Sequence, residues 1–159
     1  MKYIEAFSTV YPNTYPKGSK YTEDIALFLA GGITNCADWQ QDVVKLLSDY
    51  AVTILNPRRA NYPHNDPNAT EAQIKWEFEH LDKADILMFW FAPETLCPIT
   101  LFEYGKWLVT EKPIFVGCDP KYARRDDIII QTKLEYPNMV IHNSIVDVVD
   151  NIKYYLENH

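Results

Sequence analysis

The fold is decided by two consecutive stretches, ADILMFWF at residues 84–91 and PITLFEYG at residues 98–105. The apolar run within the first stretch is typical of a strand that is buried on both faces of a parallel sheet. Pro98 suits the first turn of the helix that follows, because proline lacks the backbone N–H that a first turn leaves unpaired. We therefore expect Glu103 to lie in the first two turns of that helix, at the carboxyl edge of the sheet, where ligands bind in open α/β sheets.

The rest of the chain alternates short apolar segments with amphipathic ones. Five segments have the composition of buried strands, at residues 25–29, 52–55, 86–91, 113–117 and 139–142. Helices are expected to begin at Asp38, Thr70, Pro98, near Arg124 and at Ser144, and glutamines three positions after Asp38 and Thr70 indicate capping boxes. This alternation predicts an α/β fold, a flavodoxin-like, doubly wound parallel sheet of five strands in the order 2-1-3-4-5 with helices on both faces.

The N-terminal residues stand apart from this alternation. Residues 1–24 are expected to form an edge strand or arm, and residues 25–159 a single domain. Residues 3–10 have the composition of an edge strand, whereas residues 11–19, rich in proline, tyrosine and glycine, are typical of a loop or arm. A second loop, with three prolines and three asparagines, is expected over the mouth of the fold at residues 61–69.

Composition excludes several classes of protein. A chain of 159 residues with 47% hydrophobic content has enough apolar surface for one full core. A net charge of −7 argues against binding to a nucleic acid polymer. The three cysteines are widely spaced, without a CxxC pair, and neither GxGxxG nor GxxxxGK[ST] occurs, so we expect no metal and no cofactor. No signal peptide and no apolar run of ~18 residues is visible, which favours the cytoplasm over a membrane.

A second carboxylate, Glu77, accompanies Glu103. On the helix expected after Thr70, the residues Ile74, Phe78 and Leu81 form a core-facing stripe, and Glu77 falls on the same face. A carboxylate on an apolar face must be paired, hydrogen-bonded or neutral.

Each of the two carboxylates also has a structural interpretation. Glu77 could be a rim residue partnered by Arg58 or Arg59, and Glu103 a solvated helix residue paired with Lys106 or Lys112. Two carboxylates that converge on one crevice instead favour general-acid and nucleophile chemistry on a glycosidic bond.

Five motifs in this order resemble the nucleoside 2-deoxyribosyltransferase superfamily, in particular its branch of short bacterial and phage proteins. They are the strand ending in Gly31-Gly32-Ile33, the segment Asn56-Pro57-Arg58-Arg59, and residues 73–77, 84–86 and 98–105; the likeness covers residues 25–156. The resemblance implies a flavodoxin-like homo-oligomer that cleaves the N-glycosidic bond of a deoxynucleoside through a covalent deoxyribosyl intermediate on Glu103. Its partners would be a nucleoside or nucleotide and a free base.

Departures from the family pattern concern the groups around the nucleophile. Typical members carry an aspartate on the helix before the third strand, and the matching position here is Glu77, with Glu79 as an alternative. They also carry an acidic residue shortly before the nucleophile, where this chain has Leu96-Cys97-Pro98, so base recognition is expected to differ. A polar residue donated by a neighbouring subunit is typical near the C-terminus, and Asn143, Tyr154, Tyr155 and Asn158 are the candidates.

In this interpretation Glu103 is ionised, and Glu77 binds the base or moves its proton. The candidate substrate-binding residues are Gly31, Gly32, Ile33, Trp39, Asn56, Arg58, Arg59, Trp90, Phe91 and Pro98. The three aromatic ones would stack on the base, or else belong to the core. The two arginines would clamp a 5′-phosphate, or else pair with acidic side chains at the rim.

Three functions remain open at this point. The first is a deoxyribosyltransferase, the second a nucleoside or nucleotide N-glycosidase in which water is the acceptor, and the third a nucleotide-binding domain without catalysis. Which base or sugar is bound, and whether it is a nucleoside or a 5′-monophosphate, is not encoded in these motifs.

Overall fold

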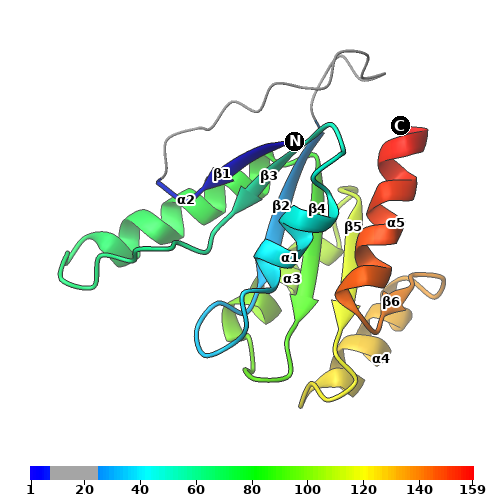
Figure 1. The fold of residues 1–159 in the computed structure, drawn as a ribbon. Coiled ribbons are helices and arrows are strands. Elements are labelled where there is room, and N and C mark those ends of the chain that lie inside the picture. The colour runs from blue at the N-terminus through cyan, green and yellow to red at the C-terminus, as the bar shows by residue number, and fades with distance from the viewer. Residues whose placement is uncertain (8–24) are drawn as a thin grey trace.

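A parallel sheet forms the centre of the computed structural model, which describes residues 1–7 and 25–159 (Figure 1). In chain order its strands are β1 (Lys2–Glu5), β2 (Ile25–Gly31), β3 (Val52–Asn56), β4 (Ile86–Phe91), β5 (Ile114–Cys118) and β6 (Ile141–His142). Among the described residues they make one six-stranded sheet of order β1-β3-β2-β4-β5-β6, and every neighbouring pair is parallel. The predicted α/β class with a parallel sheet is confirmed.

The prediction of a five-stranded sheet of order 2-1-3-4-5 is corrected to this six-stranded sheet. The additional strand is β1, which pairs with β3 from Lys2 opposite Thr53 to Glu5 opposite Asn56. We expected an edge strand within residues 3–10 but did not place it in the main sheet; β1 lies at one edge of that sheet and covers Lys2–Glu5. Residues 8–24 of the proposed arm, which include the loop predicted at 11–19, lie outside the described residues.

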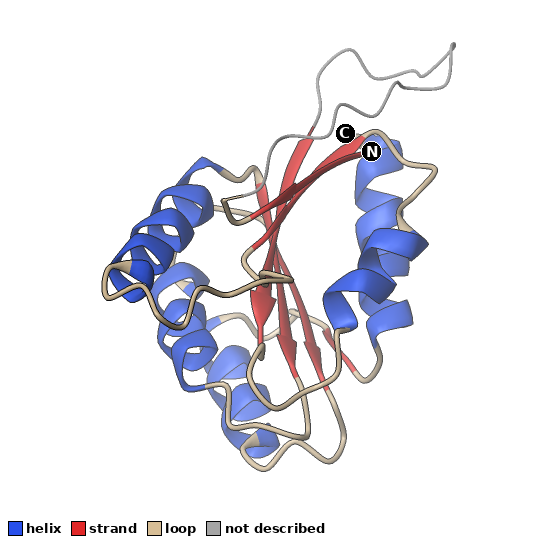
Figure 2. Ribbon diagram, turned by 60° about the vertical axis from the view of Figure 1, so that its left-hand side comes forward, coloured by secondary structure: helices blue, strands red, loops and turns tan. Residues whose placement is uncertain are grey.

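Helices cover both faces of the sheet (Figure 2). They are α1 (Trp39–Leu46), α2 (Ala69–Lys83), α3 (Pro98–Leu108), α4 (Arg125–Glu135) and α5 (Ile145–Asn158). Buried residues of α1 and α5 share one core layer, whereas those of α2, α3 and α4 share the other. Because β2 and β4 are neighbours whose following helices, α1 and α3, lie on opposite faces, their carboxyl ends are separated by a crevice.

Side chains of strand β4 contribute to both core layers. Ile86, Met88 and Trp90 point into the layer beneath α1 and α5, whereas Leu87, Phe89 and Phe91 point into the opposite layer. Alternate residues of a strand face opposite sides of its sheet, so a strand covered on both sides must be apolar throughout. The two aromatic residues proposed to stack on a base, Trp90 and Phe91, are therefore core residues that are 5% and 0% exposed.

The N-cap residue was predicted correctly for α1 but not for α2. Asp38 caps α1 as expected, with its Oδ1 accepting a hydrogen bond from the Gln41 N–H at 3.3 Å. The Gln41 side chain, expected to complete a capping box, instead donates to the Tyr3 hydroxyl. The expected cap at Thr70 is wrong, because α2 begins at Ala69 and its N-cap position is Asn68, two residues before Thr70. The Asp66 carboxylate accepts the Asn68 N–H at 2.9 Å, and this turn starts the helix before Thr70 is reached.

The outer face of α2 is more apolar than we predicted. Ile74 and Phe78 were expected to face the core, but they are 60% and 61% exposed, and of that stripe only Leu81 is buried. Helix α2 lies at the side of the sheet that carries β1 and β3, so only one edge of it meets the core (Figure 1). Within the described residues, no helix is both long and apolar enough to span a bilayer.

A small hydrogen-bond network fixes β1 to the rest of the fold. The Tyr3 hydroxyl accepts hydrogen bonds from Asn56 Nδ2 at 2.8 Å and from Gln41 Nε2 at 3.2 Å. Asn56 is only 1% exposed, and its Oδ1 accepts the backbone N–H of Arg58 at 2.9 Å. One phenol oxygen thus joins β1, β3 and α1.

We expect Tyr3→Phe to leave the buried amide of Asn56 without its acceptor. The loss should be about 1–2 kcal/mol of unfolding free energy, or roughly 2–8 °C in Tm by calorimetry. Tyr154→Phe, at an exposed position on α5, is the matched control. Equal melting temperatures for the two variants would contradict the role given to the network.

Candidate active site

A cavity of about 370 Å³ opens at the carboxyl ends of β2 and β4. One wall is the end of β2 and the residues that follow it, including Gly31, Gly32 and Ile33. The opposite wall is the start of α3, including Pro98 and Glu103, and Glu77 of α2 closes a third side. The cavity therefore occupies the crevice between the two strands whose helices diverge.

Glu103 sits in an environment that opposes its ionisation. It lies in the second turn of α3 and is half-buried. Burial raises the pKa of Glu103 to about 8, the charge of Glu77 adds to this rise, and Lys106 opposes it. At neutral pH its carboxyl group is therefore mainly protonated, because the surrounding protein replaces the water that would solvate the charge, whereas we expected an ionised Glu103.

Glu77 has a different partner from the one proposed. Its pKa is also raised by burial, but a hydrogen bond from Gln73 opposes this rise. Gln73 Nε2 donates to Glu77 Oε1 at 2.8 Å and to the Pro57 carbonyl oxygen at 2.8 Å. In the described part of the chain, neither Arg58 nor Arg59 forms an ion pair with Glu77.

The two lysines proposed as partners of Glu103 are also engaged elsewhere. Lys112 Nζ donates to the carbonyl oxygens of Leu81 and Asp82 at 2.8 and 2.7 Å. Lys106 Nζ lies 4.5 Å from the centre of the Phe78 ring, and across residues 1–7 and 25–159 it makes no ion pair with Glu103. Glu103 is thus not a solvated residue in a surface salt bridge.

Two glycines at the end of β2, Gly31 in the strand and Gly32 after it, allow the two walls to approach. A Cβ on Gly31 would collide with the Trp39 ring and would lie 2.7 Å from the Trp90 carbonyl oxygen. A Cβ on Gly32 would lie 2.7 Å from Thr95 Cγ2 and 3.0 Å from Cys97 Sγ. Both positions therefore need glycine for packing, whatever ligand the cavity takes.

Two residues of the cavity wall hold strained backbone conformations. Asn35 has a φ of 57° and Cys97 a φ of 48°, so both lie in the left-handed region although neither is glycine. Such residues persist where the surrounding structure fixes them, and they concentrate at functional sites. Asparagine adopts this region more readily than most residues, so Asn35 carried a weak signal in the sequence, whereas Cys97 carried none.

The other proposed substrate contacts lie outside the cavity lining. Trp39 is 2% exposed in the core, and its Nε1 donates to the Gly32 carbonyl at 2.9 Å. Asn56 belongs to the Tyr3 network, and Trp90 and Phe91 are in the core. The aromatic side chain that does line the cavity is Phe28, which was not proposed because it sits in the middle of a buried strand.

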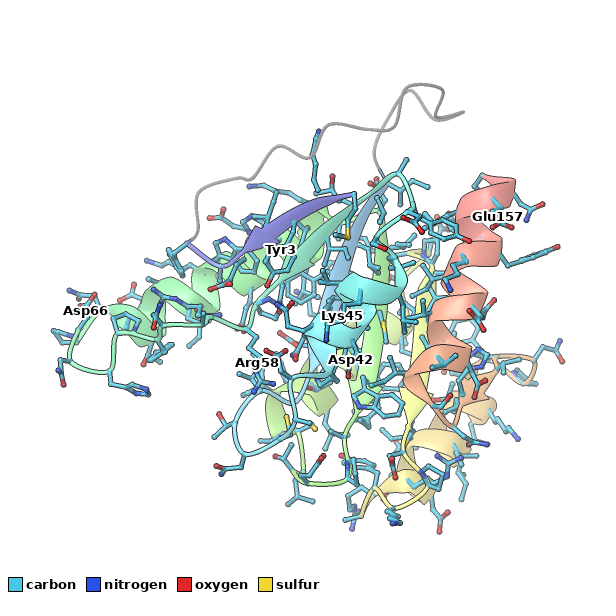
Figure 3. All side chains as sticks on the ribbon, in the orientation of Figure 1. Tyr3, Asp42, Lys45, Arg58, Asp66 and Glu157 are labelled. Carbon is cyan, nitrogen blue, oxygen red and sulfur yellow. The ribbon has the colours of Figure 1, made fainter. Side chains whose placement is uncertain are left out.

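Both arginines also lie outside this cavity. Arg58 Nη1 donates to the Ala37 carbonyl at 2.8 Å, and its Nε is 3.7 Å from Asp38, so the guanidinium lies beside the loop before α1 (Figure 3). Arg59 lies over the Phe7 ring, 4.5 Å from its centre. These side chains contact the loops around β3, and a phosphate clamp formed by them stays a prediction.

Three of the four C-terminal candidates make side-chain contacts within the described chain, whereas Tyr154 is 69% exposed. Asn143 Oδ1 accepts a hydrogen bond from Arg125 Nη2 at 2.5 Å, and Asn158 Nδ2 donates to the Tyr154 carbonyl at 2.6 Å. The Tyr155 ring stacks on His159 at 4.1 Å. For the described residues, no group of three or more His, Cys, Asp and Glu side chains could hold a metal ion.

Comparison with known proteins connects this geometry to a family. The family model described as nucleoside 2-deoxyribosyltransferase like matches residues 24–122. The matched segment contains β2 through β5 together with the whole lining of the cavity, including Glu77 and Glu103. No curated protein matches the chain.

The raised pKa of Glu103 predicts how stability depends on pH. Its folded-state pKa of about 8 exceeds the ordinary value of 4.5, so the protonated form stabilises the fold at low pH, and this contribution is lost as the pH rises toward and through 8. Glu103→Gln, which mimics the protonated form, should melt within about 1 °C of the wild type near pH 4.5 and about 3–8 °C above it at pH 9.

Thermal melts from pH 4.5 to 9 test this expectation, with Glu135→Gln at an exposed position of α4 as the control. If the wild type and Glu103→Gln keep the same difference in Tm at every pH, the carboxyl group is not desolvated.

Proposed function

The chain belongs to the nucleoside 2-deoxyribosyltransferase-like family, and from this premise we propose that it is an enzyme that moves a 2-deoxyribosyl group from one base to another. The observation that carries the proposal is the meeting of Glu77 and Glu103 on the wall of one cavity at the carboxyl edge of the sheet. A volume of about 370 Å³ is within the range of small-molecule sites and suits a nucleoside.

Glycosyl transfer with a covalent intermediate needs a nucleophile and a proton donor. In the first half-reaction a Glu103 oxygen forms a bond to C1′ as the C1′–N bond breaks, and the departing base nitrogen takes the electron pair and a proton from Glu77. In the second half-reaction a nitrogen of the acceptor base attacks C1′, its proton passes to Glu77, and Glu103 leaves as a carboxylate. After both half-reactions the enzyme carries the same groups and the same number of protons as before the first.

The desolvation of Glu103 suits a nucleophile that acts only on bound substrate. While it is protonated, Glu103 avoids the unfavourable burial of a negative charge. Transfer of that proton to Glu77 would leave Glu103 charged and poorly solvated, and so reactive toward an electron-deficient C1′. Small polar side chains, Thr34, Asn35, Thr95 and Thr100, line the cavity where a base could be recognised without a further carboxylate.

Incubation with a panel of deoxynucleosides and deoxynucleoside monophosphates, with and without a free acceptor base, tests the proposal by chromatography of the products. Exchange of bases supports it. Release of base without exchange would identify an N-glycosidase, and binding without product would identify a domain that binds nucleotides without catalysis.

We expect Glu103→Gln to reduce kcat by roughly three to four orders of magnitude, because the neutral amide cannot form the glycosyl ester. A 2-fluoro-2-deoxy substrate should accumulate as an adduct on the wild type, and peptide mass spectrometry should place it on Glu103. Glu135→Gln is the matched control. Full activity in a folded Glu103→Gln variant would reject the nucleophile assignment.

We also propose that the enzyme is a homo-oligomer whose interface uses the apolar outer faces of α2 and α3. Ile74 and Phe78 on α2, and Ile99 and Phe102 on α3, are 60–73% exposed. The two helices are neighbours, since Lys106 of α3 lies over the Phe78 ring. Exposed apolar groups that cluster in this way are typical of interfaces, and Ile99 also lines the cavity, so a second subunit here would border its mouth.

Sedimentation of Phe102→Glu tests the interface. We expect the wild type to sediment as an oligomer and Phe102→Glu to shift toward monomer by about tenfold or more in dissociation constant, because the charge would be buried without a partner. Tyr154→Glu, on the exposed face of α5, should sediment like the wild type. A monomeric wild type with full activity would contradict this proposal.

A further inference from the structure

Gln73 joins the loop after β3 to the carboxylate of Glu77. Its single amide nitrogen, Nε2, donates one hydrogen bond to the Pro57 carbonyl oxygen and the other to Glu77 Oε1, each at 2.8 Å. Pro57 and Glu77 both line the cavity. The side chain predicted to cap the start of α2 is instead a bridge behind the cavity wall.

The orientation of this amide is fixed. The Pro57 carbonyl oxygen can only accept a hydrogen bond, so it needs the nitrogen and not the oxygen of Gln73. A reversed amide would place Oε1 against that carbonyl oxygen and against a carboxylate oxygen. In the observed orientation Gln73 Oε1 is buried without a hydrogen-bond partner among the described residues, which is unfavourable. Both N–H bonds of the Gln73 amide thus have acceptors, the Pro57 carbonyl oxygen and the Glu77 carboxylate, whereas the amide oxygen has none in the described part of the chain.

The hydrogen bond from Gln73 reaches Glu77 and not Glu103, so the two carboxylates differ in how well their charged forms are stabilised. A fixed donor favours the charged form of Glu77, and it leaves Glu77 Oε2 as the oxygen without that bond. Glu103 receives no hydrogen bond from a side chain or backbone N–H within the described residues, and burial raises its pKa to about 8. The negative charge is therefore placed on Glu77 and the proton on Glu103.

Few other charged groups act on the pair. From α3 the titratable groups are Glu103 itself, Lys106, and Cys97 at the start of the helix. Strand β2 contributes Phe28 and Ala30 to the cavity, and the loop after β3 contributes Pro57, none of which is charged. Gln73 is consequently the group on α2 that can bias where the proton resides.

We propose that Gln73 is a positioning residue that keeps Glu77 as the charged member of the pair, so that Glu103 stores the proton which the departing base requires. On substrate binding this proton passes from Glu103 to Glu77 and then to the base nitrogen as the C1′–N bond breaks, which leaves Glu103 as the carboxylate that attacks C1′. The inference rests on the proposed function for the transfer step, but the location of the resting proton does not depend on it.

The first test needs no turnover. Protein labelled with ¹³C at the glutamate side-chain carboxyl carbon is titrated by NMR, with Glu77→Gln and Glu103→Gln used to assign the two signals. In the wild type the Glu103 signal should titrate at the higher pH. In Gln73→Met, which keeps the length of the side chain but removes the donor, the Glu77 signal should move upward by about one pH unit. An unchanged Glu77 titration would overturn the inference.

The control is Gln41→Met on α1, whose amide donates to the Tyr3 hydroxyl at 3.2 Å and not to either carboxylate. It should leave both titrations unchanged. Gln73→Asn, whose shorter amide cannot span the distance to both acceptors, provides a second variant if Gln73→Met does not fold; it should give the same upward shift of Glu77.

The second test uses catalysis. Gln73→Met should lower kcat about 10- to 100-fold with KM changed less than about threefold, and should displace the acidic limb of the kcat/KM profile upward. A shifted Glu77 titration with unchanged kcat would overturn the positioning role. If the Glu77 titration shifts while wild-type protein exchanges no base with any nucleoside, the proposed function fails and the assignment of the resting proton stands.

Discussion

Burial of β4 on both faces is the constraint on which the rest of the structure depends. A strand of six apolar residues at the centre of the sheet requires a helical layer on each side, and β2 and β4 send their following helices, α1 and α3, to opposite layers. Two neighbouring parallel strands whose helices diverge leave their carboxyl ends uncovered. The position of the cavity is thus set by the same core packing that stabilises the fold, and it did not require a separate structural element.

The apolar surroundings of this cavity stabilise the core but disfavour charge on its two carboxylates. The apolar surroundings that stabilise the two core layers disfavour charge on Glu103 and Glu77. The fold accommodates this by holding a proton and by donating one amide to Glu77, while an amide oxygen and two left-handed residues remain unfavourable. Such local losses are typical of sites that are organised for a reaction.

A feature of the structure was predictable from the sequence when the residues that determine it are close together in the chain. Local patterns were sufficient for β4, for Pro98 in the first turn of α3 and for the Asp38 cap, because each depends on neighbouring residues. Patterns failed where partners are distant in the chain. The pairing of β1 with β3, the exposure of Ile74 and Phe78, and the bridge made by Gln73 depend on elements whose placement no local pattern contains. Trp90 shows the remaining difficulty, since an aromatic in a strand looks the same whether it faces a core or a ligand.

The two walls of the cavity pack closely against each other at Gly32. The space that a side chain would need at this position is already filled by Thr95, Cys97 and Cys36, which come from both sides of the crevice. A single added methyl group would therefore act as a wedge, and the loop after β2 could not shift without moving the start of α3 and with it Glu103. The width of the cavity between β2 and β4 is therefore set by the contacts between the two walls and not by either wall alone.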